Sequence, residues 1–364
     1  MSSNLSPPTL KIAGLGWVTP LGADLDNVWE RLMRGDVAET RTITNPETGR
    51  EHVYAPVPPK TVEALGRNPR LRRSSAISYF AVAAGLAALE NAGVNMTPEA
   101  AARTAIVFAI SSGGVVYTRK FYEQIVKQGA NTASPLLFPE TVYNAPASHF
   151  AAQLGIDGAS YTLVGDSTVG LAALTFAGQL LATGDLDRVV VVGSEEIDWI
   201  LCEAYRDWRL SRRVGGARGA VLAEGAAAVV LAREGALNLA VHDGVPVFRR
   251  SEAGAALLRV YADLAPQRKI DAVVGCANGT FIDSIERRTL AQRFPEAALT
   301  FPKHALGEAL GASGLMQVVV AALALRHGSI PVAAAAGGTP MDSVLVSALG
   351  FNQQASGALL RLSA

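Results

Sequence analysis

Short runs of apolar and β-branched residues alternate along the chain with longer segments rich in Ala, Gly and Leu. The short runs predict strands, and the longer segments have the length and composition of helices that end at glycine. Since strands that alternate with helices pack as layers around buried sheets, this order predicts a layered α/β fold. The order is similar in the two halves of the chain, which favours a duplicated α/β unit. The predicted strands are 10–18, 104–112, 188–196, 226–234, 270–277 and 356–363, and the predicted helices are 26–34, 74–93 and 312–328.

The composition narrows the class of protein. Of the 364 residues, 49% are hydrophobic but only 6% are aromatic, which suits closely packed helices against buried sheets. The 32 Lys and Arg residues balance the 32 Asp and Glu residues, so we expect no general attraction to nucleic acid or to an anionic membrane. The cysteines, Cys202 and Cys276, form no CxxC pair, which fits a reducing cytoplasm. The His residues are dispersed, so we expect neither a metal nor another cofactor.

The sequence shows no targeting segment. The N-terminus MSSNLSPPTL lacks the basic and apolar pattern of a signal peptide, and the longest apolar runs are shorter than the ~20 residues of a membrane span. We therefore expect a soluble, cytoplasmic protein. Two polar segments, the Pro-containing 40–72 and the Arg- and Gly-rich 205–219, are predicted to be surface or interface loops.

Residues 161–174, YTLVGDSTVGLAAL, predict a strand that turns at once into a helix, with Ser167 at the corner. Backbone N–H groups point outward at the start of a helix and stabilise developing negative charge, so acyl-transfer enzymes often place a nucleophile there. Asp and Ser are also common helix N-caps, which gives Asp166 and Ser167 a purely structural alternative. Val169 stands where the G-x-S-x-G nucleophile elbow has Gly.

Six blocks of the sequence resemble, in order, segments of the β-ketoacyl synthases. GLGWVTPLGADLDNVWERLMRGD resembles the opening of that family, and CANGTFIDSIE is similar to the segment that normally reads His-Gly-Thr-Gly-Thr. KHALGEALGASG resembles the element Lys-x-x-x-Gly-His-x-x-Gly-Ala-x-Gly. The resemblance implies a dimer with a thiolase-like duplicated α/β fold of five layers, αβαβα, whose halves are 1–235 and 236–364. The blocks are 14–36, 164–196, 223–234, 276–286, 303–314 and 350–362.

The resemblance also assigns the condensing triad of the family, in which a Cys accepts the acyl chain from a carrier-protein thioester. Two His residues then promote decarboxylation of the malonyl donor and stabilise the oxyanions. In this chain the three positions are Ser167, Cys276 and Glu308. The two glycines after the family's gating Phe are Asn352 and Gln353 here, which predicts a gate that does not move. At other positions this chain has the residues that the family has, namely Lys303, Asp283 and Glu286. The resemblance places substrate binding at Phe351, Asn278 and Thr280.

The replacements change the chemistry that the site can perform. A carboxylate at Glu308 would repel the negatively charged malonyl donor, and the thiol of Cys276 is a weak donor, so decarboxylative condensation is disfavoured. Glu308 is a candidate base for a nucleophilic Ser167, and His304 is another, if the fold brings either to the hydroxyl. The structural alternative for Ser167 is a helix cap. For Glu308 it is a carboxylate favoured by the dipole at the start of the predicted helix 311–327, or one paired with Lys303. For Cys276 it is a small buried residue, and for His304 a solvated loop residue.

These observations leave three functional hypotheses. The first is a non-condensing partner of an active ketosynthase, similar to a chain length factor, in a bacterial fatty-acid or type II polyketide pathway, the aryl-polyene type among them. Chain length factors often have Gln at the Cys position, and this chain has Ser167. The second is an acyltransferase or thioester hydrolase that depends on Ser167, and the third is a condensing enzyme with an altered triad. Under each hypothesis the protein binds an acyl carrier protein or an acyl-CoA thioester. The expected dimer is either a homodimer or a heterodimer with the active ketosynthase.

Overall fold

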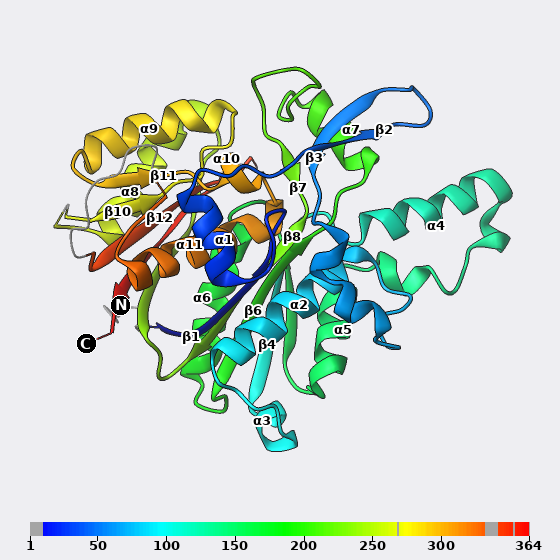
Figure 1. The fold of residues 1–364 in the computed structure, drawn as a ribbon, viewed down its shortest axis with the longest axis horizontal. Coiled ribbons are helices and arrows are strands. Elements are labelled where there is room, and N and C mark those ends of the chain that lie inside the picture. Colours follow the sequence, from blue (N-terminus) through cyan, green and yellow to red (C-terminus); the bar gives the residue numbers. More distant parts are fainter. Residues whose placement is uncertain (1–9, 268, 332–340, 352–353, 364) are drawn as a thin grey trace.

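A computed structural model describes residues 10–267, 269–331, 341–351 and 354–363. Its main feature is a ten-stranded sheet in the order β11-β10-β12-β13-β9-β1-β8-β6-β4-β5 (Figure 1). The strands of the first half are β1 (Leu10–Val18), β4 (Thr104–Ile110), β5 (Ser160–Val164), β6 (Arg188–Glu195) and β8 (Gly225–Ala232). Those of the second half are β9 (Leu237–Pro246), β10 (Ala272–Val274), β11 (Ala298–Thr300), β12 (Ser343–Leu349) and β13 (Gln354–Leu362).

The two halves repeat one strand topology. When the five strands of each half are numbered in chain order, both halves read 1-5-4-2-3 across the sheet. In both halves strand 5 pairs antiparallel with its two neighbours, and strand 2 pairs parallel with strands 4 and 3. The halves join where Leu10–Ile12 of β1 pairs antiparallel with Leu237–Leu239 of β9. The predicted duplication is therefore confirmed by the hydrogen-bonding pattern, although the amino-acid sequences of the halves show no clear repeat.

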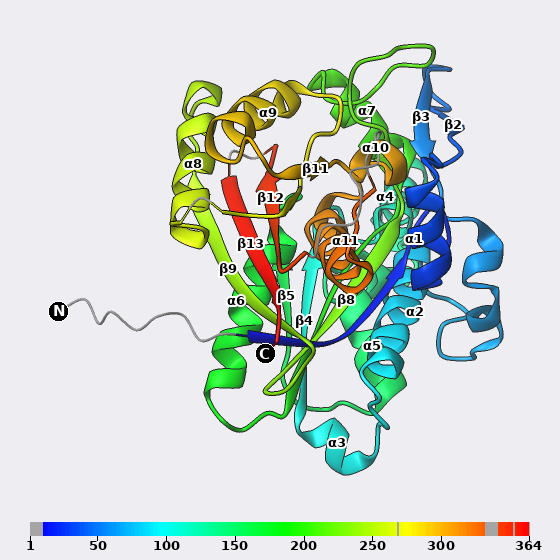
Figure 2. The same cartoon turned by 60° about the vertical axis from the view of Figure 1, so that its left-hand side comes forward.

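Helices form the other three layers. Between the two halves lie α6 (Val169–Ala182), which contacts β4, β6 and β9, and α11 (Ser313–His327), which contacts β8 and β12 (Figures 1 and 2). The outer face of the first half is covered by α2 (Ala76–Asn91), on which α5 (Ala145–Leu154) packs. The outer face of the second half is covered by α8 (Ala253–Leu264), on which α9 (Phe281–Arg293) packs. The order of layers is αβαβα, as the resemblance implies.

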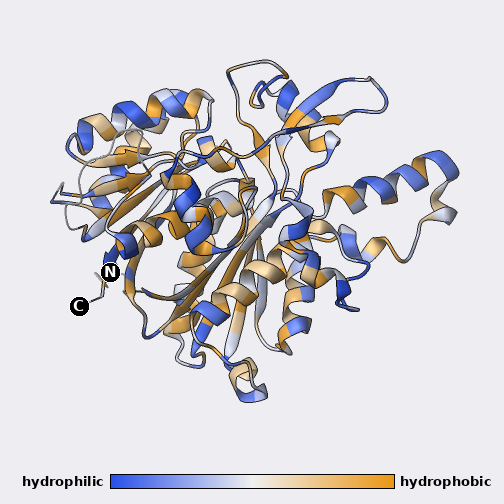
Figure 3. Ribbon diagram, in the orientation of Figure 1, coloured by the Kyte–Doolittle hydropathy of each residue, from blue (hydrophilic) through white to orange (hydrophobic). Residues whose placement is uncertain are grey.

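The central helix α11 is apolar on every side because both of its faces meet a sheet. All its residues from Ser313 to Leu325 are buried, and Figure 3 shows apolar residues concentrated in the central helices and strands. The segment Leu310–His327 is long and apolar enough to cross a membrane, but 89% of it is buried inside the protein. The apolar character of this segment is therefore explained by its burial as the core helix of the fold.

Two glycines explain the Gly-Leu-Gly motif near the N-terminus. A Cβ on Gly14 would overlap the carbonyl oxygen of Ala88, and one on Gly16 would overlap that of Ala84. Both carbonyls belong to α2, so the glycines let this helix lie directly on β1.

Most predicted elements are confirmed, with their ends shifted by a few residues, but three regions differ. The predicted strand 270–277 is reduced to Ala272–Val274, since the following residues turn toward α9. The predicted loop 40–72 contains the hairpin of β2 (Arg41–Thr44) and β3 (Glu51–Ala55), which forms a second sheet with β7 (Leu222–Ala223). The segment 205–219 begins inside a helix. Helices outside the layers are α1 (Leu25–Met33), α3 (Pro98–Ala102), the projecting α4 (Val115–Gln128), α7 (Trp199–Asp207) and α10 (Lys303–Leu306) (Figure 1).

Candidate functional site

Ser167 lies at the corner between β5 and α6, as the sequence predicts, and is 1% exposed. The helix begins two residues later, at Val169, with Thr168 as its N-cap. The carboxylate of Asp166, not the hydroxyl of Ser167, accepts hydrogen bonds from Thr168 N (3.1 Å) and Thr168 Oγ1 (3.0 Å). Within the described part of the chain, Ser167 Oγ has no hydrogen-bond partner. The helix-cap alternative for Ser167 is therefore wrong, and none of the described residues places a base within hydrogen-bonding distance of its hydroxyl.

Glu308 is fully occupied by donors. Its Oε2 atom accepts hydrogen bonds from Lys303 Nζ (2.8 Å) and Asn278 Nδ2 (2.8 Å), and its Oε1 atom accepts one from Ser313 Oγ (2.6 Å). Burial lowers the pKa of Lys303, but the adjacent carboxylate of Glu308 more than offsets this, and the net pKa is raised. The pair with Lys303, one of the two alternatives for Glu308, is thus present in the structure. The carboxylate makes its hydrogen bonds to these three residues and none to the hydroxyl of Ser167.

Ser167 and Glu308 still lie in one neighbourhood. The carbonyl oxygen of Ser167 would be 3.0 Å from a Cβ placed on Gly314, so the first turn of α11 abuts the corner. Ser313, the residue before Gly314, is the one that donates to Glu308. The fold therefore brings the two triad positions to the same helix turn without joining their side chains.

Cys276 is buried and its thiol is engaged. Its Sγ atom donates to Glu286 Oε1 (3.1 Å) and accepts from the amide of Leu349 (3.2 Å). Burial and the neighbouring Glu286 carboxylate raise the pKa of the thiol well above its usual value. Burial also raises the pKa of Glu286, whose carboxyl accepts a hydrogen bond from Ser347. Cys276 therefore belongs to a closed polar cluster and presents no donor to a substrate.

Asn278 and Thr280 connect Glu308 to the start of α9. The amide of Asn278 donates to Glu308, and its Oδ1 atom accepts from Thr280 Oγ1 (2.7 Å). Thr280 is the N-cap of α9, and the carboxylate of Asp283 accepts from the backbone amide of Asn278 (2.8 Å). Two of the three predicted substrate-binding side chains, those of Asn278 and Thr280, therefore hold the loop before α9 in this state.

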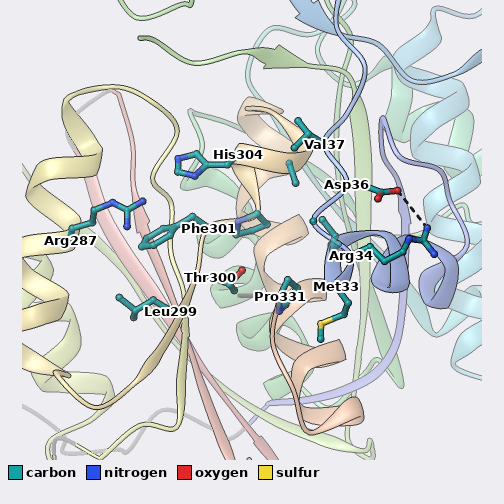
Figure 4. Close-up of a pocket in the computed structure, with 14 residues that line it drawn as sticks. Met33, Arg34, Asp36, Val37, Arg287, Leu299, Thr300, Phe301, His304 and Pro331 are labelled. Carbon is teal, nitrogen blue, oxygen red and sulfur yellow. Dashed lines mark ion pairs between the residues drawn. The ribbon is translucent and has the colours of Figure 1, made fainter. Parts of the chain in front are cut away.

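His304 is not brought to Ser167. Its side chain is 46% exposed and its Nε2 atom lies 3.7 Å from Asp283 Oδ2. It lines an outer pocket of about 720 Å³, together with Phe301, Arg287 and Met33 (Figure 4). Burial lowers the pKa of His304, only partly offset by Asp283. The role of base for Ser167 is therefore wrong for His304 in this conformation, because the side chain lies on the outer surface of α10.

The residues around Phe351 close the site. The ring of Phe351 packs edge-on against Tyr205 (centroids 5.7 Å apart). A Cβ on Gly350 would overlap the carboxylate of Asp166, and Leu349 donates to Cys276. The segment 349–351 thus touches the corner, the Cys276 cluster and α7. The prediction of a fixed gate concerns Asn352 and Gln353, which lie outside the described residues.

Tyr205 is the site residue that the sequence analysis missed. It is 6% exposed, and its hydroxyl shares a hydrogen bond with the side chain of Ser111. Burial, followed by the nearby carboxylates of Glu308, Glu195 and Asp166, raises the pKa of Tyr205 above its usual value. No motif marks it, since its segment was predicted to be a loop.

A second acid, Glu195 at the end of β6, is also buried beside the site. Its carboxyl accepts the backbone N–H groups of Ser111 and Ser112. Burial raises the pKa of Glu195 to about 8 even though these amides oppose the shift. Within the described ranges, no group of three or more His, Cys, Asp or Glu side chains is arranged to hold a metal ion.

Two family models together match residues 9–336 of the chain. The profile "Beta-ketoacyl synthase, N-terminal domain" matches residues 9–236, and "Beta-ketoacyl synthase, C-terminal domain" matches residues 229–336. The chain belongs to the β-ketoacyl synthase family. It is 23% identical to the 3-oxoacyl-[acyl-carrier-protein] synthase 2 of Coxiella burnetii, over 88% of this chain and 86% of that protein. A match of 24% identity to the enzyme of the same name from Vibrio cholerae covers 53% of this chain and 47% of that protein.

Solved structures show the same β-ketoacyl synthase fold. A β-ketoacyl synthase from Burkholderia phymatum superposes with a TM-score of 0.80 at 19% identity, over 98% of this chain and all of that one. A structure described as a ketosynthase in complex with its chain length factor, from Xenorhabdus doucetiae, superposes with a TM-score of 0.76 at 17% identity, over 100% of both chains. This β-ketoacyl synthase family member therefore keeps the scaffold, while at the condensing positions Cys276 and Glu308 bond to other buried residues and not to Ser167.

Proposed function

We propose that the chain is a non-condensing β-ketoacyl-synthase-like subunit, of the chain-length-factor type, that pairs with an active ketosynthase in the cytoplasm. The pathway is bacterial fatty-acid or type II polyketide synthesis, and the substrate of the pair is carried by an acyl carrier protein. One relative in structure is described as a ketosynthase complexed with its chain length factor, which supports this kind of pairing.

The observation that carries the proposal is the state of Glu308. Its carboxylate is buried and bonded to Lys303, Asn278 and Ser313. A malonyl donor would bring a second carboxylate next to this one, and the low dielectric of the site strengthens their repulsion. Two His donors, which would stabilise the enolate, are absent from the triad positions. The condensing step therefore has neither a site for its donor nor a stabilised transition state.

The edge strand β5 supports a dimer. It pairs with β4 on one side and ends the main sheet on the other. Tyr161 and Val164 on this strand are 43% and 55% exposed. An exposed edge with apolar side chains and unpaired backbone groups is suited to pairing with a second strand. In a two-fold dimer, each subunit can then wall part of the other's pocket without performing chemistry itself.

The proposal is tested by expressing the tagged chain with the ketosynthases of its own genome. We expect one ketosynthase to co-purify in equal amount and the pair, but not this chain alone, to extend an acyl chain on its carrier protein. A homodimer that extends acyl chains by itself would contradict the proposal. Changing a wall residue of the shared pocket, such as Phe351→Ala, should then change the product length and leave assembly intact.

A second candidate function is supported by one observation: the hydroxyl of Ser167 is buried and has no hydrogen-bond partner among the described residues. At the start of α6 this hydroxyl could accept an acyl group from a thioester, if a base approached it in another conformation. Intact-mass measurement after incubation with acyl thioesters would show an acyl increment in the native chain that is lost in Ser167→Ala. No increment would remove this candidate and leave the first.

A further inference from the structure

Arginines gather around a hollow of about 1040 Å³ between the segment 206–219 and the start of α9. Figures 1 and 2 show α7, which leads into this segment, and α9 at the same end of the molecule. Five arginines and one aspartate, Asp283, line the hollow, which gives its lining a formal charge of +4. The whole chain has a net charge of zero, so the positive charge is local to this surface. We call this surface the arginine face, and its arginines are Arg206, Arg209, Arg213, Arg218 and Arg250.

None of these five guanidinium groups has an ion-pair partner among the residues that the structure describes. Asp283 does not neutralise them, because its carboxylate accepts the backbone N–H groups of Asn278 (2.8 Å) and Gly279 (3.0 Å). Arg250 is oriented by the ring of Phe281, with its Cζ atom 4.1 Å from the ring centroid. Arginines gathered without acidic partners repel one another, so a surface of negative charge would stabilise this arrangement.

Three large apolar side chains are exposed beside these arginines. Trp208, Val214 and Phe248 are 60%, 49% and 79% exposed, and each is the immediate neighbour of an arginine in the sequence. They come from three different segments: the end of α7, the loop after it and the segment after β9. Single exposed apolar side chains are ordinary on a protein surface. Three of them around one group of arginines indicate a surface that meets both negative charge and an apolar phase.

The loop that carries Val214 is a tight turn on a closed base. At the tip, the backbone N–H of Gly216 donates to the carbonyl oxygen of Arg213 (2.8 Å), so Val214 occupies a central position of the turn. At the base, the backbone N–H of Arg212 donates to the carbonyl oxygen of Ala220 (2.8 Å). The loop therefore holds an apolar side chain outward, directly after an arginine.

We propose that the arginine face docks on the surface of a bilayer that contains anionic phospholipids. Guanidinium groups bind phosphate oxygens in bidentate geometry, and clustered basic residues are attracted to anionic lipid headgroups. Exposed Trp and Phe side chains partition into the boundary between headgroups and acyl chains. The hollow receives headgroup phosphates, while Trp208, Val214 and Phe248 insert around it.

A bilayer fits this surface better than an acidic protein does. The three apolar side chains are carried by separate segments, and a fluid lipid surface can receive each of them independently. A protein partner would need a matched, well-packed pocket for each apolar side chain. The inference goes beyond the proposed function, because docking on lipid requires neither condensation nor a partner subunit.

Co-sedimentation of the intact, isolated chain with vesicles tests the proposal. We expect the chain to pellet with vesicles of equal parts phosphatidylglycerol and phosphatidylcholine, and to stay in solution with phosphatidylcholine alone. Added salt should weaken this binding, because it screens the headgroup charges. The variant Arg213→Glu/Arg218→Glu should lose affinity for the anionic vesicles by roughly tenfold or more. The matched control is Arg326→Glu/Arg361→Glu, which makes the same change of charge at exposed positions near the ends of α11 and β13.

A second variant separates insertion from attraction between charges alone. Phe248→Ser leaves every arginine in place, and we expect it to weaken binding to the anionic vesicles severalfold without lowering the unfolding temperature. Val37→Ser, at a residue that is 64% exposed and outside the arginine face, is its control and should bind as the native chain does. The native chain should also show a blue shift of tryptophan emission on binding, and Trp208→Phe should lose that shift.

Four results would overturn the proposal. They are no pelleting with the anionic vesicles at low salt, equal affinities of the Arg213→Glu/Arg218→Glu variant and its control, and equal affinities of Phe248→Ser and Val37→Ser. The fourth is binding of an acidic carrier protein, or of soluble glycerol 3-phosphate, with no binding of the vesicles. None of these results depends on whether a ketosynthase partner is found.

Discussion

The Nζ atom of Lys303 lies 2.8 Å from the Oε2 atom of Glu308, and the two side chains are 3% and 0% exposed. Burying two charges is favourable only when they are paired and their remaining hydrogen bonds are made. Asn278 and Ser313 supply those bonds to Glu308. Condensation needs a hydrogen-bond donor at this position. Glu308 is an acceptor instead, and its hydrogen bonds are already made by Lys303, Asn278 and Ser313.

This pair predicts strong energetic coupling between its members. Lys303→Met leaves a buried carboxylate without its cation, and we expect it to lower the free energy of unfolding by about 3–5 kcal/mol. The double variant Lys303→Met/Glu308→Gln should lose less than the sum of the two single variants, because neither charge remains. Urea unfolding of the four proteins measures the coupling. Additive losses would contradict the account of Glu308 as a residue held by Lys303.

The contact between Gly350 and Asp166 predicts a strict need for glycine. A Cβ on Gly350 would overlap the Asp166 carboxylate, which is fixed by Thr168. We expect Gly350→Ala to cost about 1–3 kcal/mol of unfolding free energy through overpacking. Gly158→Ala is the matched control, since no atom lies within 4 Å of its Cβ position. Equal unfolding midpoints for the two variants would show that the segment 349–351 is not packed on the corner.

The buried acid Glu195 predicts a dependence of stability on pH. Burial raises its pKa from 4.5 to about 8, so the folded chain retains a proton that the unfolded chain has released. The folded state then binds more protons, and the free energy of unfolding falls as pH rises between these two values, by up to about 1.4 kcal/mol per pH unit. Glu195→Gln should make this fall shallower, whereas the exposed Glu296→Gln should not. Parallel pH curves for Glu195→Gln and the native chain, from urea unfolding, would be the contrary result.

The exposed edge of β5 predicts where a partner pairs. Val164→Lys places a charge on the edge strand, and we expect it to weaken assembly with the ketosynthase by roughly tenfold or more. Val37→Lys, which changes a residue of 64% exposure away from this edge, should assemble normally. Sedimentation of the mixed subunits measures both. Normal assembly of Val164→Lys would mean that the dimer forms through another surface.

The sequence predicts the layers well because they depend on local patterns. The apolar run from Leu10 to Val18 and the glycine that follows Asn91 and Ala92 mark elements that the structure confirms. The pair of Glu308 with Lys303 could also be foreseen, because the residues are five apart in one motif. Tyr205 and Glu195 could not, since their roles arise from contacts with distant segments such as Ser111. Composition also does not decide whether Asp166 or Ser167 bonds to Thr168, the N-cap of α6, and the structure shows that Asp166 does.

The most direct test of the account is the release of carbon dioxide from malonyl carrier protein by the purified chain alone. The account predicts no release above that of a reaction without protein, because the Glu308 carboxylate excludes the donor and no His pair stabilises the enolate. Release that is proportional to protein concentration and lost in Glu308→Gln would contradict it and make the chain a condensing enzyme with an altered triad.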